Sequence, residues 1–285
     1  MNNSEIKGIL IPIGGNVDIG TRDGKEDEYK LDFVSGGILS HVVQQAGGLQ
    51  AKIVVIPAAS SIPEIIAQNY MNAFKSLGCS NICTLHIFDR NDSEKPEALE
   101  LIKKADGILL TGGNQSKIVS KMLDTSLHRI MREKYRKEPF VIAGTSAGAM
   151  CMSHEMIVGG NITESFRKGT VYMGTGMGFI TELIIDSHFI SRGRFSRLAE
   201  AVAKFSNLVG VGLAEDTGLI IRHKKEIQVI GSGMAVVLDA RKSNHNCQSV
   251  LHRGTPMTVM NMHTHILSNG DLFEISTTKD HDFVN

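Results

Sequence analysis

Four short aliphatic runs, each followed by glycine or other small residues, constrain the fold of this chain more than any other feature. The runs span residues 8–13, 52–56, 107–110 and 140–143. Their hydrophobicity is continuous rather than alternating, which is typical of strands buried on both faces of a parallel sheet. Amphipathic stretches of helical length separate the runs. The pattern predicts a doubly wound α/β sheet with right-handed crossovers, whose chemistry gathers beyond the carboxyl ends of the strands.

The rest of the chain predicts helices first and further strands later. Helices are expected over residues 33–45, 63–77, 93–104 and 116–134. Ser93 is expected to be the N-cap of the third helix. Beyond about residue 209 come short apolar runs joined by turn sequences, at residues 208–213, 218–222, 227–230, 235–238 and 262–267. No proline- or serine-rich linker precedes these runs, so we expect a single domain over residues 1–285 with a β-rich C-terminal extension.

The charge balance and the hydropathy pattern exclude several classes of protein. Lysine plus arginine and aspartate plus glutamate number 30 each, so the formal net charge is zero. A nucleic-acid or membrane-surface partner would need a basic excess. No apolar run reaches the ~18–20 residues of a membrane span, and the N-terminus shows no secretory signal. Four irregularly spaced cysteines, none in a C-x-x-C pair, indicate reduced thiols. We therefore expect a cytoplasmic protein with no nucleic-acid and no membrane partner.

The strongest local motif is Gly144-Thr145-Ser146-Ala147-Gly148, which follows the fourth apolar run and precedes a stretch compatible with a helix. This is the G-x-S-x-G nucleophile elbow in its strand–turn–helix context. The backbone of such a serine is strained, so its neighbours must be small. The Ala147 N–H would lie at a helix N-terminus, where it can stabilise a developing oxyanion. A tight turn that merely needs small residues is the alternative, and the context favours a nucleophile at Ser146.

A serine nucleophile needs a base, and His188 is the best placed histidine because it follows the strand-like residues 183–186. A carboxylate should orient the imidazole and stabilise its charged form. Glu164 lies between the elbow and His188, whereas Asp186 lies two residues before His188 and would share its strand face. Spacing favours Glu164 only slightly, so both acids remain candidates.

Three arginines follow the candidate base at once: Arg192, Arg194 and Arg197. Guanidinium groups recognise carboxylates through paired hydrogen bonds, so this cluster suits a substrate that carries carboxylates. The alternative is a solvated helix face on which the arginines pair with acids such as Glu200.

The turn after the third apolar run, Thr111-Gly112-Gly113-Asn114-Gln115, has two glycines that let its backbone approach a ligand closely. The Gly113 N–H can complete an oxyanion hole, and Gln115 offers a donor and an acceptor to a peptide. A plain strand-to-helix turn explains the segment equally well. It is not a phosphate loop, because the Lys-Ser/Thr pair is missing.

Two other patterns point to no cofactor. His263 and His265 would share one face of a strand, which suits a metal ion, but no third ligand is evident near them in the sequence. Gly14-Gly15-Asn16 lacks the G-x-G-x-x-G spacing of a dinucleotide site. We expect neither a metal nor an organic cofactor.

Taken together, these segments resemble the cyanophycinases, serine exopeptidases related to the bacterial dipeptidase E. The resemblance rests on residues 14–15, 112–115 and 144–149, and on the motif Asp186-x-His188-Phe189-x-x-Arg192-x-Arg194-x-x-Arg197-Leu198. These segments occur in matching order over most of the chain. The β-rich end, including residues 215–217, is also similar.

The resemblance implies a fold, a substrate and roles for particular residues. The fold would be a flavodoxin-like three-layer α/β/α sandwich, forming a homodimer that needs no metal. Ser146 would be the nucleophile, His188 the general base and Glu164 the acid that orients it. The residues that shape the substrate pocket would be Gln115, Asp186, Ser187, Arg192, Arg194 and Arg197. The implied substrate is cyanophycin, a poly-aspartate backbone with arginine on each side-chain carboxyl, cut from its end into β-Asp-Arg dipeptides.

The sequence departs from this family at Ser187, where the family has glutamine. The shorter side chain removes an amide that could contact the substrate, and the charged segment 18–32 could also reshape the pocket. Three interpretations therefore compete: a cyanophycinase, a related dipeptidase acting on short Asp or isoaspartyl peptides, and a non-catalytic binding protein on the same scaffold. The complete Ser-His-Glu set favours the two enzymes.

Overall fold

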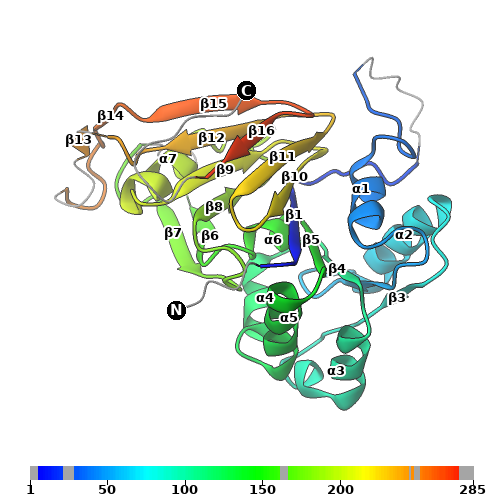
Figure 1. Cartoon of the computed structure of the whole chain (residues 1–285). Coiled ribbons are helices and arrows are strands. Elements are labelled where there is room, and N and C mark those ends of the chain that lie inside the picture. The colour runs from blue at the N-terminus through cyan, green and yellow to red at the C-terminus, as the bar shows by residue number, and fades with distance from the viewer. Residues whose placement is uncertain (1–5, 22–28, 161–165, 244, 247–250, 276–285) are drawn as a thin grey trace.

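The structure is a computed structural model that describes residues 6–21, 29–160, 166–243, 245–246 and 251–275. Its central element is an eight-stranded sheet with helices on both sides (Figure 1). In spatial order the strands are β16 (Leu272–Glu274), β11 (Glu226–Gly231), β10 (Thr217–Arg222), β1 (Ile9–Ile13), β5 (Val141–Thr145), β4 (Gly107–Leu110), β2 (Ile53–Ile56) and β3 (Ile82–Thr84). Strands β1, β5, β4, β2 and β3 are parallel, whereas β10, β11 and β16 are antiparallel.

The four aliphatic runs of the sequence form β1, β2, β4 and β5, which are neighbours in the parallel part of this sheet. Along β1, Leu10 packs into the apolar core on one face, and Ile11 and Ile13 pack into the core on the other. Because both faces are covered, these strands consist of apolar residues and glycine, with Thr145 at the end of β5 as the polar exception, which explains the continuous hydrophobicity. The predicted α/β class with a mainly parallel sheet is confirmed.

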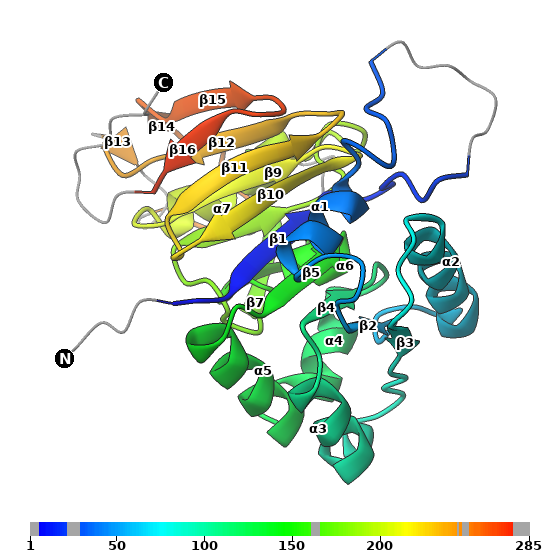
Figure 2. The ribbon, with the colours of Figure 1, turned by 45° about the vertical axis from the view of Figure 1, so that its right-hand side comes forward.

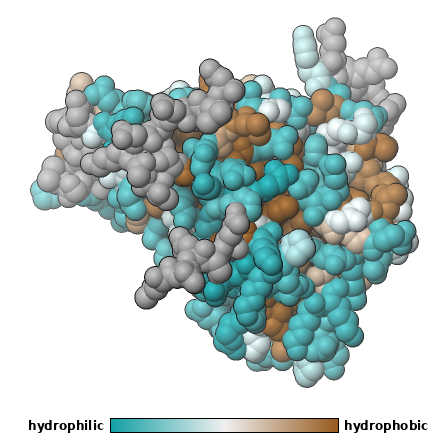
Figure 3. Space-filling model, in the orientation of Figure 1, coloured by the Kyte–Doolittle hydropathy of each residue, from teal (hydrophilic) through white to brown (hydrophobic). Residues whose placement is uncertain are grey.

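Helices cover the two faces of the parallel part. Helices α1 (Ile38–Gln45) and α2 (Pro63–Ser76) lie on one face. The other face carries α3 (Pro96–Lys103), α4 (Gln115–Met122) and α5 (Ser126–Lys137), with the short 3-10 turn η1 (Asn91–Glu94) before α3. The outer surface of α3 and α5 is mainly hydrophilic in Figure 3. Among the described residues, no helix combines the length and the apolar character that a membrane crossing requires.

A second sheet packs beside the antiparallel part, as Figure 2 shows. Its strands, in spatial order, are β15 (His263–Leu267), β12 (Ala235–Asp239), β9 (Val209–Leu213) and β8 (Leu183–Asp186). Helix α7 (Phe195–Lys204) covers its outer face. The remaining strands pair as β6 (Glu155–Gly160) with β7 (Val171–Thr175) and β13 (His245–Asn246) with β14 (Val259–Met260). The C-terminal strands are therefore present as predicted, but they are divided between the two sheets.

Two local predictions were wrong. The single helix expected over residues 116–134 is interrupted, because Asp124 has a left-handed backbone (φ 59°) and Thr125 caps a new helix by accepting a hydrogen bond from the His128 N–H. Ser93 is not an N-cap: its buried hydroxyl donates to the Lys121 carbonyl at 2.9 Å, and α3 begins three residues later at Pro96. Proline at the first position of a helix fixes φ and needs no hydrogen bond there.

Candidate active site

Ser146 lies at the sharp turn between β5 and α6 (Ala147–Met150), at the carboxyl edge of the parallel strands. Its backbone is strained, with φ 51° and ψ −106°, and its N–H donates to the Ile13 carbonyl of β1 at 2.8 Å. A β-carbon on Gly148 would lie 2.1 Å from the Leu110 carbonyl oxygen. One on Gly144 would lie 2.5 Å from the backbone of Gly148. The turn is therefore possible only with glycine at both places, as in a nucleophile elbow.

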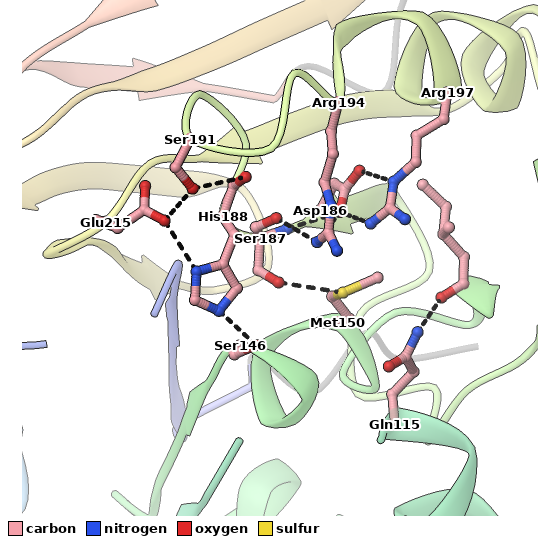
Figure 4. A network of polar contacts seen from close by, with 11 residues as sticks. Gln115, Ser146, Met150, Asp186, Ser187, His188, Ser191, Arg194, Arg197 and Glu215 are labelled. Carbon is pink, nitrogen blue, oxygen red and sulfur yellow. Dashed lines mark hydrogen bonds and ion pairs between the residues drawn. The ribbon is translucent and has the colours of Figure 1, made fainter. Parts of the chain in front are cut away.

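His188 approaches Ser146 from the second sheet, just beyond the end of β8. Its Nε2 lies 3.0 Å from the Ser146 Oγ (Figure 4). The backbone of His188 is left-handed (φ 49°), and its N–H donates to the Gly14 carbonyl at 2.9 Å. These contacts tie the imidazole to the end of β1. The structure thus brings together the serine and the histidine that the sequence analysis selected.

The carboxylate beside His188 belongs to Glu215, which lies between β9 and β10. Its Oε1 is 2.9 Å from the His188 Nδ1. Glu164, which the sequence analysis favoured, lies outside the described residues, and Asp186, the other acid considered, contacts arginines instead. Sequence reasoning missed Glu215 as an orienting acid. The available signal was its position directly after an apolar run of the β-rich end, at the end of a predicted strand.

Strand pairing explains why these two side chains meet. Strands β8 and β9 are parallel neighbours, with Asp186 opposite Gly212. Residues that follow the two strands therefore leave the second sheet at the same edge. His188 is two residues beyond that pair and Glu215 three, and the Phe189 N–H donates to the Leu213 carbonyl at 3.0 Å. The next residue, Asp216, donates its N–H to the Gly15 carbonyl at 2.9 Å, which fastens the β9–β10 turn to the end of β1.

The Glu215 carboxylate is held in its charged form by hydrogen bonds. Partial burial opposes ionisation, but donors from Ser191 and His188 outweigh that cost, so the pKa of Glu215 lies below its ordinary value. The Ser191 Oγ donates to Oε1, the same oxygen that contacts His188. A carboxylate with these partners can orient a neutral imidazole and stabilise its protonated form.

Asp186 and two of the predicted arginines form a buried cluster next to this site. The Asp186 carboxylate is fully buried and accepts from Arg197 through both oxygens, with Nε 2.6 Å from Oδ2. Arg194 Nη1 lies 3.3 Å from Asp186 Oδ1 and donates to the Ser187 carbonyl at 2.5 Å. Two guanidinium groups against one carboxylate leave the cluster with a net positive charge. Arg192 is exposed on the same turn.

Burial lowers the pKa of Arg194 to about 10 but does not remove its charge. Repulsion from Arg197 and Arg192 is a smaller cause of the same lowering. Attraction to Asp186 opposes both effects. At neutral pH Arg194 is still protonated, and it retains a buried Nε that has no hydrogen-bond partner among the described residues. The cluster therefore keeps positive charge next to the site, which favours anionic groups there.

The remaining predicted residues lie around Ser146, although not all of them have free side chains. A β-carbon on Gly112 would be 3.5 Å from the Ser146 β-carbon, so the 112–113 turn runs beside the nucleophile. Gly113 has φ 139°, and a β-carbon there would lie 2.2 Å from the Ala59 carbonyl oxygen. Ala147 is the first residue of α6.

Gln115 and Ser187 make contacts within the protein. Gln115, at the start of α4, donates from Nε2 to the Ile157 carbonyl of β6 at 2.8 Å. Ser187 is buried, and its Oγ lies 3.2 Å from the Met150 sulfur (Figure 4). The side chain of Ser187 is therefore engaged with α6.

The structure also describes the two histidines considered as metal ligands. His263 and His265 lie on β15, an edge strand of the second sheet. Within the described ranges, no three side chains of His, Cys, Asp or Glu gather in a way that could hold a metal ion.

Comparison with known proteins places these features in a family. The model of peptidase family S51 matches residues 35–230. A cyanophycinase of Trichormus variabilis is 36% identical over 238 residues, which is 84% of this chain and 80% of that protein. A cyanophycinase of Geminocystis herdmanii is 33% identical over 84% of this chain and 88% of its own length. The crystal structure of a peptidase from an acI-B1 actinobacterium shares the fold, with a TM-score of 0.63 and 21% identity over 95% of this chain and 98% of that chain.

Proposed function

The chain belongs to peptidase family S51 and is a serine peptidase, and we propose that its substrate is cyanophycin, which it cuts from the polymer end into β-Asp-Arg dipeptides. The observation that carries this proposal is the contact of 3.0 Å between Ser146 Oγ and His188 Nε2, with Glu215 behind the imidazole. The names of its relatives, with identities of 33% and 36%, supply the substrate class.

The reaction begins with the two residues at this contact. His188 accepts the Ser146 proton through Nε2 as the serine oxygen attacks the scissile carbonyl carbon. Glu215 keeps the His188 Nδ1 protonated and stabilises the imidazolium that forms. We assign this role to Glu215 in place of Glu164, because its Oε1 lies 2.9 Å from Nδ1.

We propose that two backbone amides stabilise the tetrahedral oxyanion. The Ala147 N–H begins α6 directly after the nucleophile, and the Gly113 N–H belongs to the turn that runs beside Ser146. Neither amide donates to a backbone acceptor among the described residues. Loss of one such donor costs about 3–4 kcal/mol of transition-state stabilisation in other hydrolases.

The second half of the reaction uses the same groups. The imidazolium of His188 protonates the leaving amine, which departs and leaves an ester between Ser146 and the acyl part of the substrate. Water then attacks this ester as His188 takes a proton from it, and His188 returns that proton to the Ser146 oxygen when the bond to the acyl group breaks. The Ser146 hydroxyl is regenerated in each cycle, so no cofactor takes part in the proposed reaction.

The arginine cluster supports a substrate that carries carboxylates. Arg192 is exposed on this turn and can contact an anionic group, and the buried guanidinium of Arg194 adds positive charge behind it. Arg197 is committed to Asp186 and would act by fixing that carboxylate and the start of α7. Ser187 is buried with its hydroxyl on the Met150 sulfur, so in this chain it supplies no amide to the substrate.

The experiment that tests this function is incubation of the purified full chain with insoluble cyanophycin, with soluble products identified by mass. Release of β-Asp-Arg by the wild type, and by a Ser76→Ala control on an exposed hydroxyl of α2, is the expected result. Ser146→Ala should fold and release nothing. Retained activity in Ser146→Ala would overturn the nucleophile. An intact polymer together with cleavage of short isoaspartyl peptides would instead identify the related dipeptidase.

We also propose that the chain is one domain, forms a homodimer and works in the cytoplasm, as the family resemblance implies. One domain is supported by β1, which pairs with β5 from the middle of the chain and with β10 from its C-terminal part. Light scattering after size exclusion tests the dimer, since a particle of twice 31.0 kDa is expected.

A further inference from the structure

We propose that Ser191 is a positioning residue for the catalytic histidine. Its hydroxyl holds the Glu215 carboxylate in one orientation and in its charged form, and that carboxylate orients His188. This inference rests on the proposed serine mechanism and deepens it. It adds Ser191 to the mechanism as a fourth side chain, which supports the acid Glu215. The hydroxyl donates to Glu215 Oε1, and the same oxygen contacts the His188 Nδ1 at 2.9 Å.

The turn that follows β8 places Ser191 on this carboxylate. The Arg192 N–H donates to the His188 carbonyl at 3.2 Å, and the Arg194 N–H donates to the Phe189 carbonyl at 3.0 Å. This compact backbone returns residue 191 over residue 188, with the Ser191 Oγ 3.5 Å from the His188 carbonyl oxygen. One turn of chain therefore supplies both the imidazole and the hydroxyl that converge on Glu215 (Figure 4).

The hydroxyl has a specific effect on the carboxylate. Glu215 is partly buried, which disfavours its charge, and the hydrogen bond from Ser191 is the largest of the effects that favour it. The neighbouring acid, Asp216, does not share this hydroxyl, because its carboxylate accepts from the Asp18 N–H and the Ser232 hydroxyl. Among the described residues, the ionisable side chain in contact with Glu215 is His188. Ser191 thus holds the acid in one orientation and in the charged form that an imidazolium needs.

The same geometry excludes Ser191 as a second nucleophile. Its proton is directed to a carboxylate whose pKa is below its ordinary value, and such a group is too weak a base to take it. The imidazole Nε2, the only ring nitrogen not occupied by Glu215, is in contact with Ser146. Ser191 therefore acts through Glu215 rather than on the substrate.

The test measures the rate at which a fluorophosphonate labels Ser146 in the full-length protein, as a function of pH. In this reaction the Ser146 Oγ–P bond forms, fluoride leaves and His188 takes the serine proton, so the rate reports the base without any peptide substrate. Ser191→Ala is expected to label about tenfold more slowly at neutral pH, which corresponds to one hydrogen bond to a charged group.

The acid limb of the pH profile is the second readout. Without the Ser191 hydroxyl, Glu215 becomes easier to protonate, and its negative charge acts on His188 alone. The acid limb of Ser191→Ala is therefore expected to move to higher pH. Ser191→Thr retains a hydroxyl on an exposed residue with room for a methyl group, and it should restore the wild-type limb. Ser76→Ala, which removes an exposed hydroxyl on α2, should change neither quantity.

The outcomes separate this inference from the proposed function. A wild-type rate and an unmoved acid limb in folded Ser191→Ala would overturn the role of Ser191 alone. The same holds if Ser191→Ala and Ser191→Thr behave alike, since a purely steric role would not distinguish a hydroxyl. If wild type labels at Ser146 but releases no dipeptide from cyanophycin, the substrate proposal fails while the Ser191 result stands. If folded wild type does not label at Ser146, both proposals fall.

Discussion

A β-carbon on Gly15 would lie 2.3 Å from the His188 imidazole, so the ring packs directly on the backbone at the end of β1. Gly15 also has φ 126°, a conformation that other residues rarely adopt. The general base of the proposed mechanism is thus positioned from two sides: by the carboxylate of Glu215 and by the absence of a side chain at residue 15.

The first prediction follows from this contact. Gly15→Ala should displace the imidazole from Ser146 and lower kcat by about 100-fold or more, because misplacement of a catalytic group by ~1 Å costs that much. Steady-state kinetics and a thermal melt measure the two effects. The matched control is Gly47→Ala, since Gly47 also has positive φ (111°) but a β-carbon there would meet nothing within 4 Å. Equal losses of activity in the two variants would contradict a steric role for residue 15.

The second prediction separates the two candidate acids. Glu215→Gln should keep the fold and lower kcat by about 100- to 10,000-fold, because the amide can neither hold the Nδ1–H tautomer nor stabilise an imidazolium. Glu164→Gln, changed in the same way, should retain kcat near wild type. Parallel assays on cyanophycin decide between them. The reverse order of losses would return the role to Glu164.

The third prediction concerns the buried ion pair beside the site. Arg197→Met leaves the Asp186 carboxylate, which is fully buried, without its bidentate partner. Breaking a buried pair from one side costs about 3–5 kcal/mol of unfolding free energy. Urea denaturation measures this loss. As a control, Lys103→Met removes an exposed pair with Glu100 and should leave the urea midpoint unchanged. A midpoint for Arg197→Met equal to that of wild type would show that Asp186 finds other partners.

The fourth prediction is a pH dependence of stability that arises from His128. This buried ring accepts the Asp124 N–H at Nδ1 (3.1 Å) and lies 2.8 Å from the Met177 carbonyl through Nε2. Burial is the main cause that lowers the pKa of His128, and the contact with the Met177 carbonyl opposes it. The folded state therefore binds fewer protons than the unfolded chain below the ordinary value of 6.5.

The stability that neutral His128 supports is fully present above pH 6.5 and is lost as the pH falls toward the lowered folded-state pKa. The contribution to the slope reaches at most about 1.4 kcal/mol per pH unit. Urea denaturation between pH 7 and pH 5 should show a steeper loss in wild type than in His128→Leu. The control, His252→Gln on an exposed histidine, should keep the wild-type slope. Parallel slopes for wild type and His128→Leu would rule out this source.

Local sequence determined the parts of this protein that depend on short-range sterics and burial. The nucleophile was predictable because only glycine fits at positions 144 and 148, where a β-carbon would strike the backbone. Four of the five parallel strands were predictable because burial on both faces demands unbroken apolar runs, as in β1. The fifth, β3, is a short and only partly buried edge strand, and it was not predicted. His188 could be selected because it follows an apolar run at the sheet edge where chemistry gathers.

Tertiary structure alone decided the partner of that histidine. Glu215 is 27 residues from His188, and the two meet because β8 pairs in parallel with β9. Strand pairing of this kind depends on the whole arrangement of the two sheets. The same holds for the C-terminal strands, whose apolar patterns are alike although β10 joins the central sheet and β9 the second one. A local pattern records whether a residue is buried, but the residue that buries it is fixed only when distant segments of the chain pack together.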